Sequence, residues 1–238
     1  MNLILFEPGE ILIPRDDLRI QHILTILKMK PGEEFDAGII DGPRGKAWID
    51  SEEDSQEVSI GFRSTEEPHP LAPLALAVGA CRPQTVRKIL LQATTLGVGA
   101  IHFFASSKSE QGYLKSKMYR AEQIRPYLIE GAQQAFCTLL PKVVIHDNFQ
   151  DCLEANGKNP GISLDNYEAV SSLGNFDFTS IRTLTLWIGS ERGWSAAERN
   201  SFRDNEITLC SLGTRVLRTE TAAVAGTALC LSGLGWFE

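Results

Sequence analysis

The sequence predicts an α/β protein with a mainly parallel sheet, preceded by a small β-barrel domain. After residue 70, short apolar runs alternate with segments of helical periodicity. Before it, short β-leaning segments follow one another between Gly, Pro and Asp turns. The charge balance changes there too, from seven Lys/Arg against fifteen Asp/Glu in residues 1–70 to sixteen against fifteen in residues 71–238. We therefore predict two domains, at 1–69 and 70–238.

The N-terminal domain is predicted from its strands and turns. The segments "LILFEPG", "EEFDAGIID", "KAWID" and "EVSIGF" are short and β-leaning, and "DGPRG" at 41–45 is typical of a turn. One helix is expected around Asp17–Met29. The segment "STEEPHPLAP" at 64–73 contains three prolines and has the composition of a linker. These features predict a small barrel with one helix and a domain break near 67–72.

The C-terminal domain is predicted from alternating strands and helices. In "RPQTVRKILLQATTLG" the apolar residues recur at helical spacing until Gly97 ends the helix. Further helices are expected over Ser116–Phe136, from Ser195 and from Thr219. Such alternation implies a mainly parallel sheet covered on both faces. Its strands are predicted at 74–80, 100–106, 142–147, 161–165, 182–190 and 206–210.

Composition and charge exclude several classes of protein. A net charge of −7 argues against nucleic-acid binding through bulk electrostatics. The five cysteines form no CxxC pair and the four histidines are scattered, so no metal site is expected. No stretch approaches the ~18 uninterrupted apolar residues of a membrane helix, and the opening "MNLILFEPGE" is unlike a signal peptide. We therefore expect a cytoplasmic protein.

Three loops that follow predicted strands are candidates for the functional site, because parallel sheets bind ligands at the carboxyl ends of their strands. They are "SLDN" around residue 164, "IGSERGWS" at 188–195 and "SLGTRVLR" at 211–218. The segment "GVGAIH" lacks the third glycine of a dinucleotide fingerprint and precedes a strand, and no Walker loop is present. A standard Rossmann or P-loop site is therefore excluded.

Four segments in order along the whole chain carry a resemblance to a known family. They are "HILTILKMKPG" at 22–32, "KILLQATTLGVGAIHFF", "IGSERGWSAAE" and "LGTRVLRTETAAVAGTAL". Together they resemble the RsmE-type family of 16S ribosomal RNA uridine-N3 methyltransferases, which belong to the SPOUT class. The resemblance implies an N-terminal PUA-like β-barrel that binds RNA and a C-terminal trefoil knot. It also implies S-adenosylmethionine bound in the knot loops, and a homodimer that packs through the knotted ends.

The resemblance assigns roles to residues of the three loops. Arg218 and Glu191 are the expected catalytic residues. Some neighbouring positions depart from the family pattern, namely Ser190 and Arg192, Asp165 and Asn166, and Gln133, Cys137 and Leu139 in "GAQQAFCTL". The expected cofactor-binding residues are Leu164, Ile188, Gly189, Glu191, Leu212, Gly213, Val216 and Leu217.

The chemistry of methylation at a uridine N3 explains why an arginine is needed. N3 loses its proton as it attacks, and the negative charge spreads onto O2 and O4, where a fixed guanidinium would stabilise it. Arg218 is the candidate, but it could instead brace its loop by pairing with Glu191 or Glu220. In "IGSERGWS", Ser195 and Glu198 are expected to form a capping box at the start of a helix rather than to bind cofactor.

RNA contact is expected from local basic patches. The segment 106–125 is rich in Lys and Arg, with Tyr113 and Tyr119 available for stacking. A second basic group lies in the barrel domain. The partner is expected to be ribosomal RNA or the small ribosomal subunit. The expected RNA-binding residues are Arg15, Arg19, Lys28, Lys30, Lys108, Lys115, Lys117 and Arg120.

The positions that depart from the family pattern leave two alternatives to uridine-N3 methylation. One is a SPOUT methyltransferase that acts on a ribose 2′-hydroxyl or another base, and the other is a catalytically inactive RNA-binding paralogue.

The closing helix is composed of small residues, as expected if it lies close to backbone within a knot, although alanine is also simply a good helix former. The apolar end "LSGLGWFE" is expected at or near the dimer interface.

Overall fold

The computed structural model describes residues 3–50 and 56–237. The chain forms two compact units. The first contains the residues up to Pro70 together with Ala132–Leu140, and the second contains Leu71–Gly131 together with the chain from Pro141 onward. Ala132–Leu140 is tied to the first unit by hydrogen bonds, among them one from the Thr138 hydroxyl to the Gly42 carbonyl at 2.6 Å. The sequence division at residue 70 does not include this returning segment.

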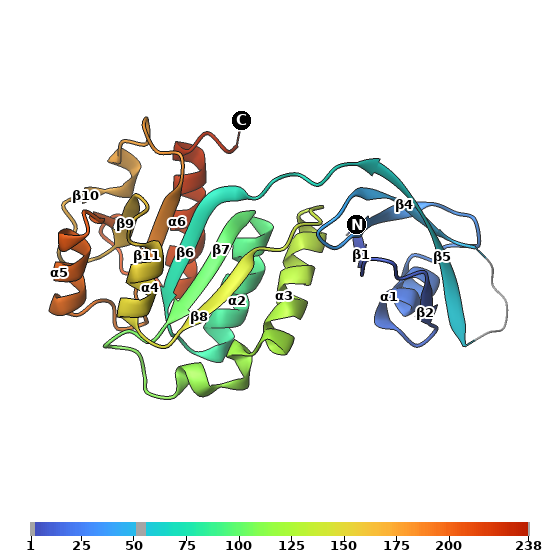
Figure 1. Ribbon diagram of the computed structural model, residues 1–238, viewed down its shortest axis with the longest axis horizontal. Helices are drawn as coiled ribbons and strands as arrows, with labels where there is room; N and C mark the ends of the chain where they lie inside the picture. Colours follow the sequence, from blue (N-terminus) through green and yellow to red (C-terminus); the bar gives the residue numbers. More distant parts are fainter. Residues whose placement is uncertain (1–2, 51–55, 238) are drawn as a thin grey trace. The chain divides into compact units, whose positions relative to one another are not determined.

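The first unit is a small curled sheet (Figure 1), and its buried apolar side chains form a core of their own. β1 pairs with β3 in parallel, and the remaining pairs are antiparallel. The helix expected at 17–29 is present as α1 (Leu18–Gln21) followed by a π-helical turn, η1 (His22–Ile26). The strands, in their order across the sheet, are β1 (Ile4–Phe6), β3 (Phe35–Ile39), β4 (Arg44–Ile49), β5 (Glu57–Glu66) and β2 (Leu12–Pro14).

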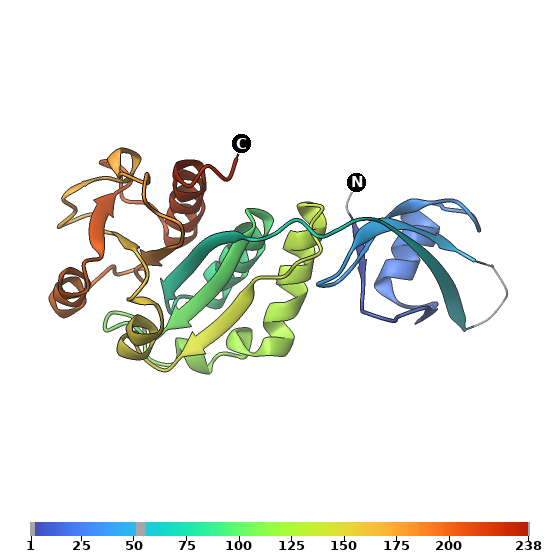
Figure 2. The same ribbon diagram turned by 45° about the horizontal axis from the view of Figure 1, so that its top comes forward.

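The second unit is built on a seven-stranded sheet in which every pair is parallel, as the alternation of strands and helices predicts. Figure 2 shows β6, β7 and β8 running side by side. The strands, in their order across the sheet, are β10 (Ser171–Ser172), β12 (Thr208–Ser211), β9 (Gly161–Leu164), β11 (Leu184–Ile188), β6 (Ala72–Gly79), β7 (Val98–Phe104) and β8 (Lys142–His146).

Helices cover this sheet. α2 (Pro83–Thr95) packs against α6 (Thr219–Gly233), and α6 also contacts β6 and β11. α4 (Phe149–Asn156) and α5 (Ala196–Asp204) share an aromatic core that includes Trp187 and Trp194. α4 is absent from the sequence-based expectation.

The helix expected over 116–136 differs at its start. It is α3 (Ala121–Gln134), preceded by the 3₁₀ turns η2 (Tyr113–Lys115) and η3 (Lys117–Tyr119). A further 3₁₀ turn, η4 (Leu173–Asn175), follows β10. Over the described residues, no helix has the length and apolar content needed to cross a membrane.

The small residues of α6 let it lie close to the sheet. A Cβ atom on Gly226 would come within 2.9 Å of the Leu164 side chain and 3.0 Å of the Leu186 side chain. A Cβ atom on Gly233 would come within 2.3 Å of the Phe178 ring. Larger side chains at these positions would displace neighbouring groups, because protein interiors are close-packed. Close approach therefore accounts for the composition of this helix better than helix propensity alone.

Candidate functional site

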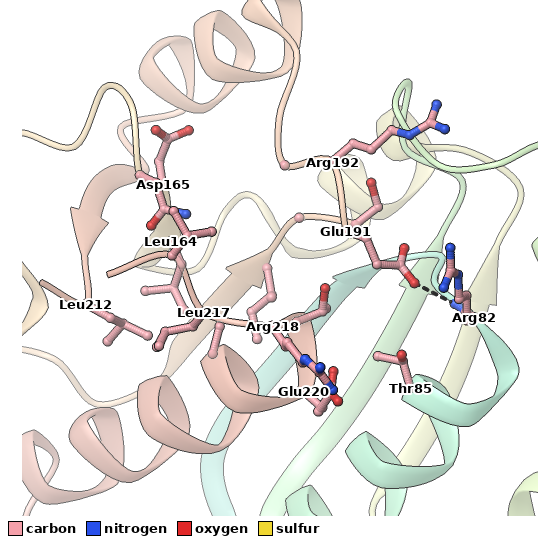
Figure 3. A pocket seen from close by; sticks show the side chains of 18 of the residues that line it. Arg82, Thr85, Leu164, Asp165, Glu191, Arg192, Leu212, Leu217, Arg218 and Glu220 are labelled. Carbon is pink, nitrogen blue, oxygen red and sulfur yellow. Dashed lines mark hydrogen bonds between the residues drawn. The ribbon is translucent and has the colours of Figure 1, made fainter. Parts of the chain in front are cut away.

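A pocket lies where the loops after β9, β11 and β12 meet the first turns of α2 and α6 (Figure 3). Its volume of about 640 Å³ is within the range of small-molecule sites. The parallel sheet places the ends of these strands at one edge, which is where such folds bind ligands. The lining residues are Arg82, Gln84, Thr85, Lys88, Leu164–Tyr167, Ile188–Gly193, Leu212, Val216–Glu220 and Ala222.

The strand ends supply an apolar part of the pocket. Leu164 ends β9, Ile188 ends β11 and Leu212 follows β12. Figure 3 shows Leu164, Leu212 and Leu217 on one side and Arg82, Thr85 and Glu220 on the other. Of the eight residues expected to bind cofactor, all except Gly213 line this pocket.

Gly213 is not among the residues that line the pocket, and its contact with the cofactor stays a prediction. It is exposed, its φ is +100°, and an added Cβ atom would meet nothing within 4 Å. A side chain there would strain the backbone, because this φ favours glycine. The loop needs glycine for its conformation.

The two glutamates near Arg218 have other partners. Glu191 accepts a hydrogen bond from the backbone N–H of Arg82 at 2.9 Å, and Lys88 pairs with Glu220 at 3.0 Å. Arg218 is exposed and makes no hydrogen bond or ion pair with any residue that the structure describes. The bonds expected of a loop-bracing arginine are therefore not formed among these residues.

The charge of Arg218 nevertheless acts on Glu220. Burial favours the neutral form of this carboxyl group, but its backbone hydrogen bond, the Lys88 partner and the charges of Lys88 and Arg218 together lower its pKa. Arg218 occupies the N-cap position of α6, and its side chain makes no capping hydrogen bond. α2 also begins beside the pocket, at Pro83. Two helix N-termini therefore add positive potential to the pocket.

The loop after β9 is held by a buried ion pair that the sequence gives no means of predicting. Asp165 lies 2.6 Å from the Nε of Arg199 on α5, and the two side chains are 1% and 8% exposed. Asp165 also accepts hydrogen bonds from the backbone N–H groups of Tyr167 and Glu168, at 2.5 and 2.7 Å. Burial opposes its ionisation, but these three donors outweigh that effect and lower its pKa.

The loop after β11 is tied to its surroundings by serines and a buried glutamate. Ser195 and Glu198 form the expected capping box at the start of α5. Glu198 also accepts hydrogen bonds from the backbone and hydroxyl groups of Ser107, both at 2.9 Å. Ser190 is buried, and its hydroxyl lies 3.3 Å from that of Ser106. Ser190 thus joins this loop to the one after β7.

The expected RNA-binding residues differ in how free their side chains are. Arg19 is engaged, because its guanidinium pairs with Glu10 and Asp17 and donates to the Leu5 carbonyl. Arg15 and Lys108 are half-buried, and Arg15 also has a partner of its own. The exposed members are Lys28, Lys30, Lys115, Lys117 and Arg120.

The two tyrosines expected to stack on RNA also differ. Tyr119 is buried, and its hydroxyl bonds to both the N–H and the carbonyl of Cys81, so its ring is not available for stacking. Tyr113 is half-exposed, and its hydroxyl accepts a hydrogen bond from Arg82 and donates one to Glu110. Its position is therefore fixed from both sides.

Two histidines that are scattered in the sequence meet on neighbouring strands. The Nδ1 atom of His102 on β7 lies 2.9 Å from the Nε2 atom of His146 on β8, and the Cys152 sulfur is within 4.8 Å of both. The Asn156 amide lies 3.3 Å from the same His102 nitrogen. Burial and the nearby charges of His146 and Lys142 lower the pKa of His102 to about 4. Burial also lowers the pKa of His146 and raises that of the Cys152 thiol, so all three groups favour their neutral forms. None of them lines the pocket.

Comparison with known proteins places the chain in a family. Residues 67–231 match the family model of the RNA methyltransferase domain. The chain is 34% identical to the ribosomal RNA small subunit methyltransferase E of Treponema pallidum, over 98% of this chain and 91% of that protein. It is 28% identical to ribosomal RNA small subunit methyltransferase E 1 of Borreliella burgdorferi, over 98% and 99%.

Solved structures share the fold. The ribosomal RNA small subunit methyltransferase E of Neisseria gonorrhoeae, bound to S-adenosyl methionine, superimposes with a TM-score of 0.76 at 22% identity, covering 97% of both chains. A probable rRNA-methyltransferase of Porphyromonas gingivalis has a TM-score of 0.81 at 20% identity, covering 99% of this chain and 100% of that one. The predicted α/β fold, a mainly parallel sheet preceded by a small β-domain, is confirmed, and the predicted PUA-like barrel is a small curled five-stranded sheet. The chain belongs to the ribosomal RNA small subunit methyltransferase E family.

Proposed function

We propose that the protein transfers the methyl group of S-adenosylmethionine to N3 of a uridine in 16S ribosomal RNA. The observation that carries this proposal is the convergence of three separate post-strand loops on one pocket, with seven of the eight expected cofactor residues and both expected catalytic residues in its lining. The relatives named for methylation of small-subunit ribosomal RNA support the same activity. Ribosomal RNA as substrate implies a cytoplasmic location.

The pocket suits this cofactor in three respects. The apolar side chains of Leu164, Ile188 and Leu212 suit the adenine ring. The carboxylates of Glu191 and Glu220 suit a positively charged sulfonium, and the N-termini of α2 and α6 suit a carboxylate. S-adenosylmethionine supplies an electrophilic methyl group when bound. None of these features calls for a metal ion, and we propose that the reaction uses none.

The residues of this chain then position the nucleophile and stabilise charge. Arg218 is free of other partners among the described residues, so its guanidinium can meet the charge that develops on O2 and O4 of the base. Glu191 is the candidate acceptor for the N3 proton, since one carboxylate oxygen accepts the Arg82 N–H while the other accepts no hydrogen bond from a residue that the structure describes. Holding the base in line with the methyl group would supply much of the rate enhancement.

The test is to incubate the protein with labelled S-adenosylmethionine and small ribosomal subunits from cells that lack this activity, in the presence of chelator. Mass spectrometry of the nucleosides should find 3-methyluridine, and mass spectrometry of ribonuclease fragments should place it at a single position. Label in another base or in a ribose would replace the N3 assignment by a different RNA methylation. Absence of label from both subunits and naked 16S RNA would overturn the proposal.

We further propose that the protein is a homodimer through the end of α6 and the residues that follow it. Leu229, Trp236 and Phe237 are exposed there, at 41%, 37% and 59%, and a partner would cover them. Leu231, also expected at the interface, is instead buried within its own unit. Sedimentation should give about twice the chain mass of 26.2 kDa, and a monomer at micromolar concentration would contradict this.

A further inference from the structure

Tyr167 is the only aromatic residue among the described residues that line the pocket. It is 79% exposed, although it belongs to a loop whose neighbouring residue, Asp165, is buried. An aromatic ring at the mouth of a site that takes RNA has a specific use, because proteins hold unstacked bases against aromatic side chains. The hydroxyl of Tyr167 has no hydrogen-bond partner among the described residues. We therefore consider the face of its ring as the part that contacts a ligand.

The position of this ring is held by contacts with its own loop and with α5. Asp165 accepts hydrogen bonds from the backbone N–H groups of Tyr167 and Glu168, which fold the loop into a tight turn. The guanidinium of Arg199 pairs with Asp165 and lies 5.5 Å from the centre of the Tyr167 ring. Glu168 is held in turn by ion pairs with Arg199 and Arg203 of α5. One face of the ring therefore rests on a cation that is itself buried and paired.

We propose that Tyr167 is the stacking platform for the target nucleobase, and that Asp165 and Arg199 are the positioning residues that present it. The proposal rests on the proposed function and names a specificity-determining residue of the same site. Ile188 at the end of β11 is buried, whereas Tyr167 is exposed, so the ring is accessible to an RNA base that arrives from solvent. The ring and the guanidinium of Arg218 line one pocket, so a base stacked on the ring can direct its oxygens toward the cation.

The test compares substitutions at Tyr167 using unmethylated small subunits and labelled S-adenosylmethionine. Tyr167→Leu and Tyr167→Ala should raise the KM for RNA about five- to hundredfold, as expected for the loss of one base–aromatic stack. Tyr167→Phe keeps the ring and should stay within about twofold of the original protein. The affinity for S-adenosylmethionine, measured by calorimetry without RNA, should be unchanged in all three.

Val170→Ala is the matched control. Val170 belongs to the same loop region and is 77% exposed, but it does not line the pocket. Its truncation should change neither the KM for RNA nor cofactor affinity. Because Tyr167 is also exposed, its substitutions should leave the melting temperature unchanged, which separates a lost contact from a lost fold.

The role of Arg199 as a positioning residue is tested by measuring the KM for RNA and the KM for S-adenosylmethionine. Arg199→Lys keeps a charge opposite Asp165 but loses the planar group beneath the ring, so its KM for RNA should rise while the KM for S-adenosylmethionine stays constant. Combining it with Tyr167→Leu should add little further effect, because both changes act through the same ring.

The outcomes separate the inference from the proposed function. If the unaltered protein methylates subunits and Tyr167→Leu behaves like Val170→Ala, the stacking platform is overturned and the methyltransferase stands. If Tyr167→Leu weakens cofactor binding as much as RNA binding, the ring serves the adenine and the inference is also overturned. If the unaltered protein neither binds S-adenosylmethionine nor methylates RNA, the proposed function fails, and the inference with it.

Discussion

Two loops that line the pocket differ in how their charged side chains are held. In the loop after β9, Asp165 is buried, paired with Arg199 and bonded to two backbone N–H groups. In the loop after β12, Arg218 is exposed and makes no hydrogen bond or ion pair with a described residue. The charge of Asp165 therefore stabilises the conformation of its own loop, whereas the charge of Arg218 remains available to a ligand. A site that must both present a base and stabilise charge on it needs both arrangements.

The largest effect should follow from breaking the buried pair. Arg199→Met leaves Asp165 buried without its partner, which should lower the free energy of unfolding by about 3–5 kcal/mol. The matched control is Arg203→Met on the same helix, since Arg203 pairs with Glu168 at the exposed surface and should cost less than about 1 kcal/mol. Urea unfolding of both variants makes the comparison, and equal losses would show that the pair does not hold the loop.

Removing the free cation should affect turnover and not stability. Arg218→Ala should lower single-turnover methylation by roughly a hundredfold or more, the scale of one preorganised donor, with cofactor affinity nearly unchanged. Arg218→Lys should restore only part of the rate.

Arg215→Ala is the matched control for Arg218, because Arg215 is exposed in the same loop but does not line the pocket. Its turnover should stay near that of the original protein. Full activity in Arg218→Ala would remove its catalytic role. A parallel fall in activity, cofactor affinity and melting temperature would point to loop bracing instead.

A smaller effect is expected from the backbone of the second loop. Gly213→Val forces a branched side chain into a positive-φ conformation, which should cost about 1–3 kcal/mol. Because the space around Gly213 is open, the loss should appear as weaker binding of S-adenosylmethionine through a distorted loop, with the curled β-domain still folded. Calorimetry and circular dichroism test this, and unchanged affinity would show that the loop conformation is not required.

The smallest effect concerns pH. The folded-state pKa of Asp165 is lowered from its ordinary value of 3.8, so its stabilising contribution is present above that value and is lost as pH falls below it. As pH falls from 5 to 3, the free energy of unfolding should therefore decrease more for the original protein than for Asp165→Asn. Urea unfolding at three pH values measures this, and identical pH profiles would contradict it.

The sequence predicts the strand ends of the site well, because a parallel sheet necessarily brings Leu164, Ile188 and Leu212 to one edge. It does not predict Arg199, which reaches Asp165 across 34 residues through the packing of α5. The return of Ala132–Leu140 to the first unit also depends on tertiary contacts, which the local sequence does not predict. α4 is short, and only its Asn148 cap, which accepts a hydrogen bond from the Asp151 N–H, could have signalled it.

Calorimetric titration in chelator tests most directly whether the pocket formed by the three post-strand loops binds S-adenosylmethionine. The protein should bind about one molecule per chain. Leu212→Asn, which places an amide in the apolar wall, should weaken binding at least roughly tenfold. Val170→Asn, at a residue that is 77% exposed and does not line the pocket, should not change it. Absence of binding by the unaltered protein, or equal binding by Leu212→Asn, would contradict the account.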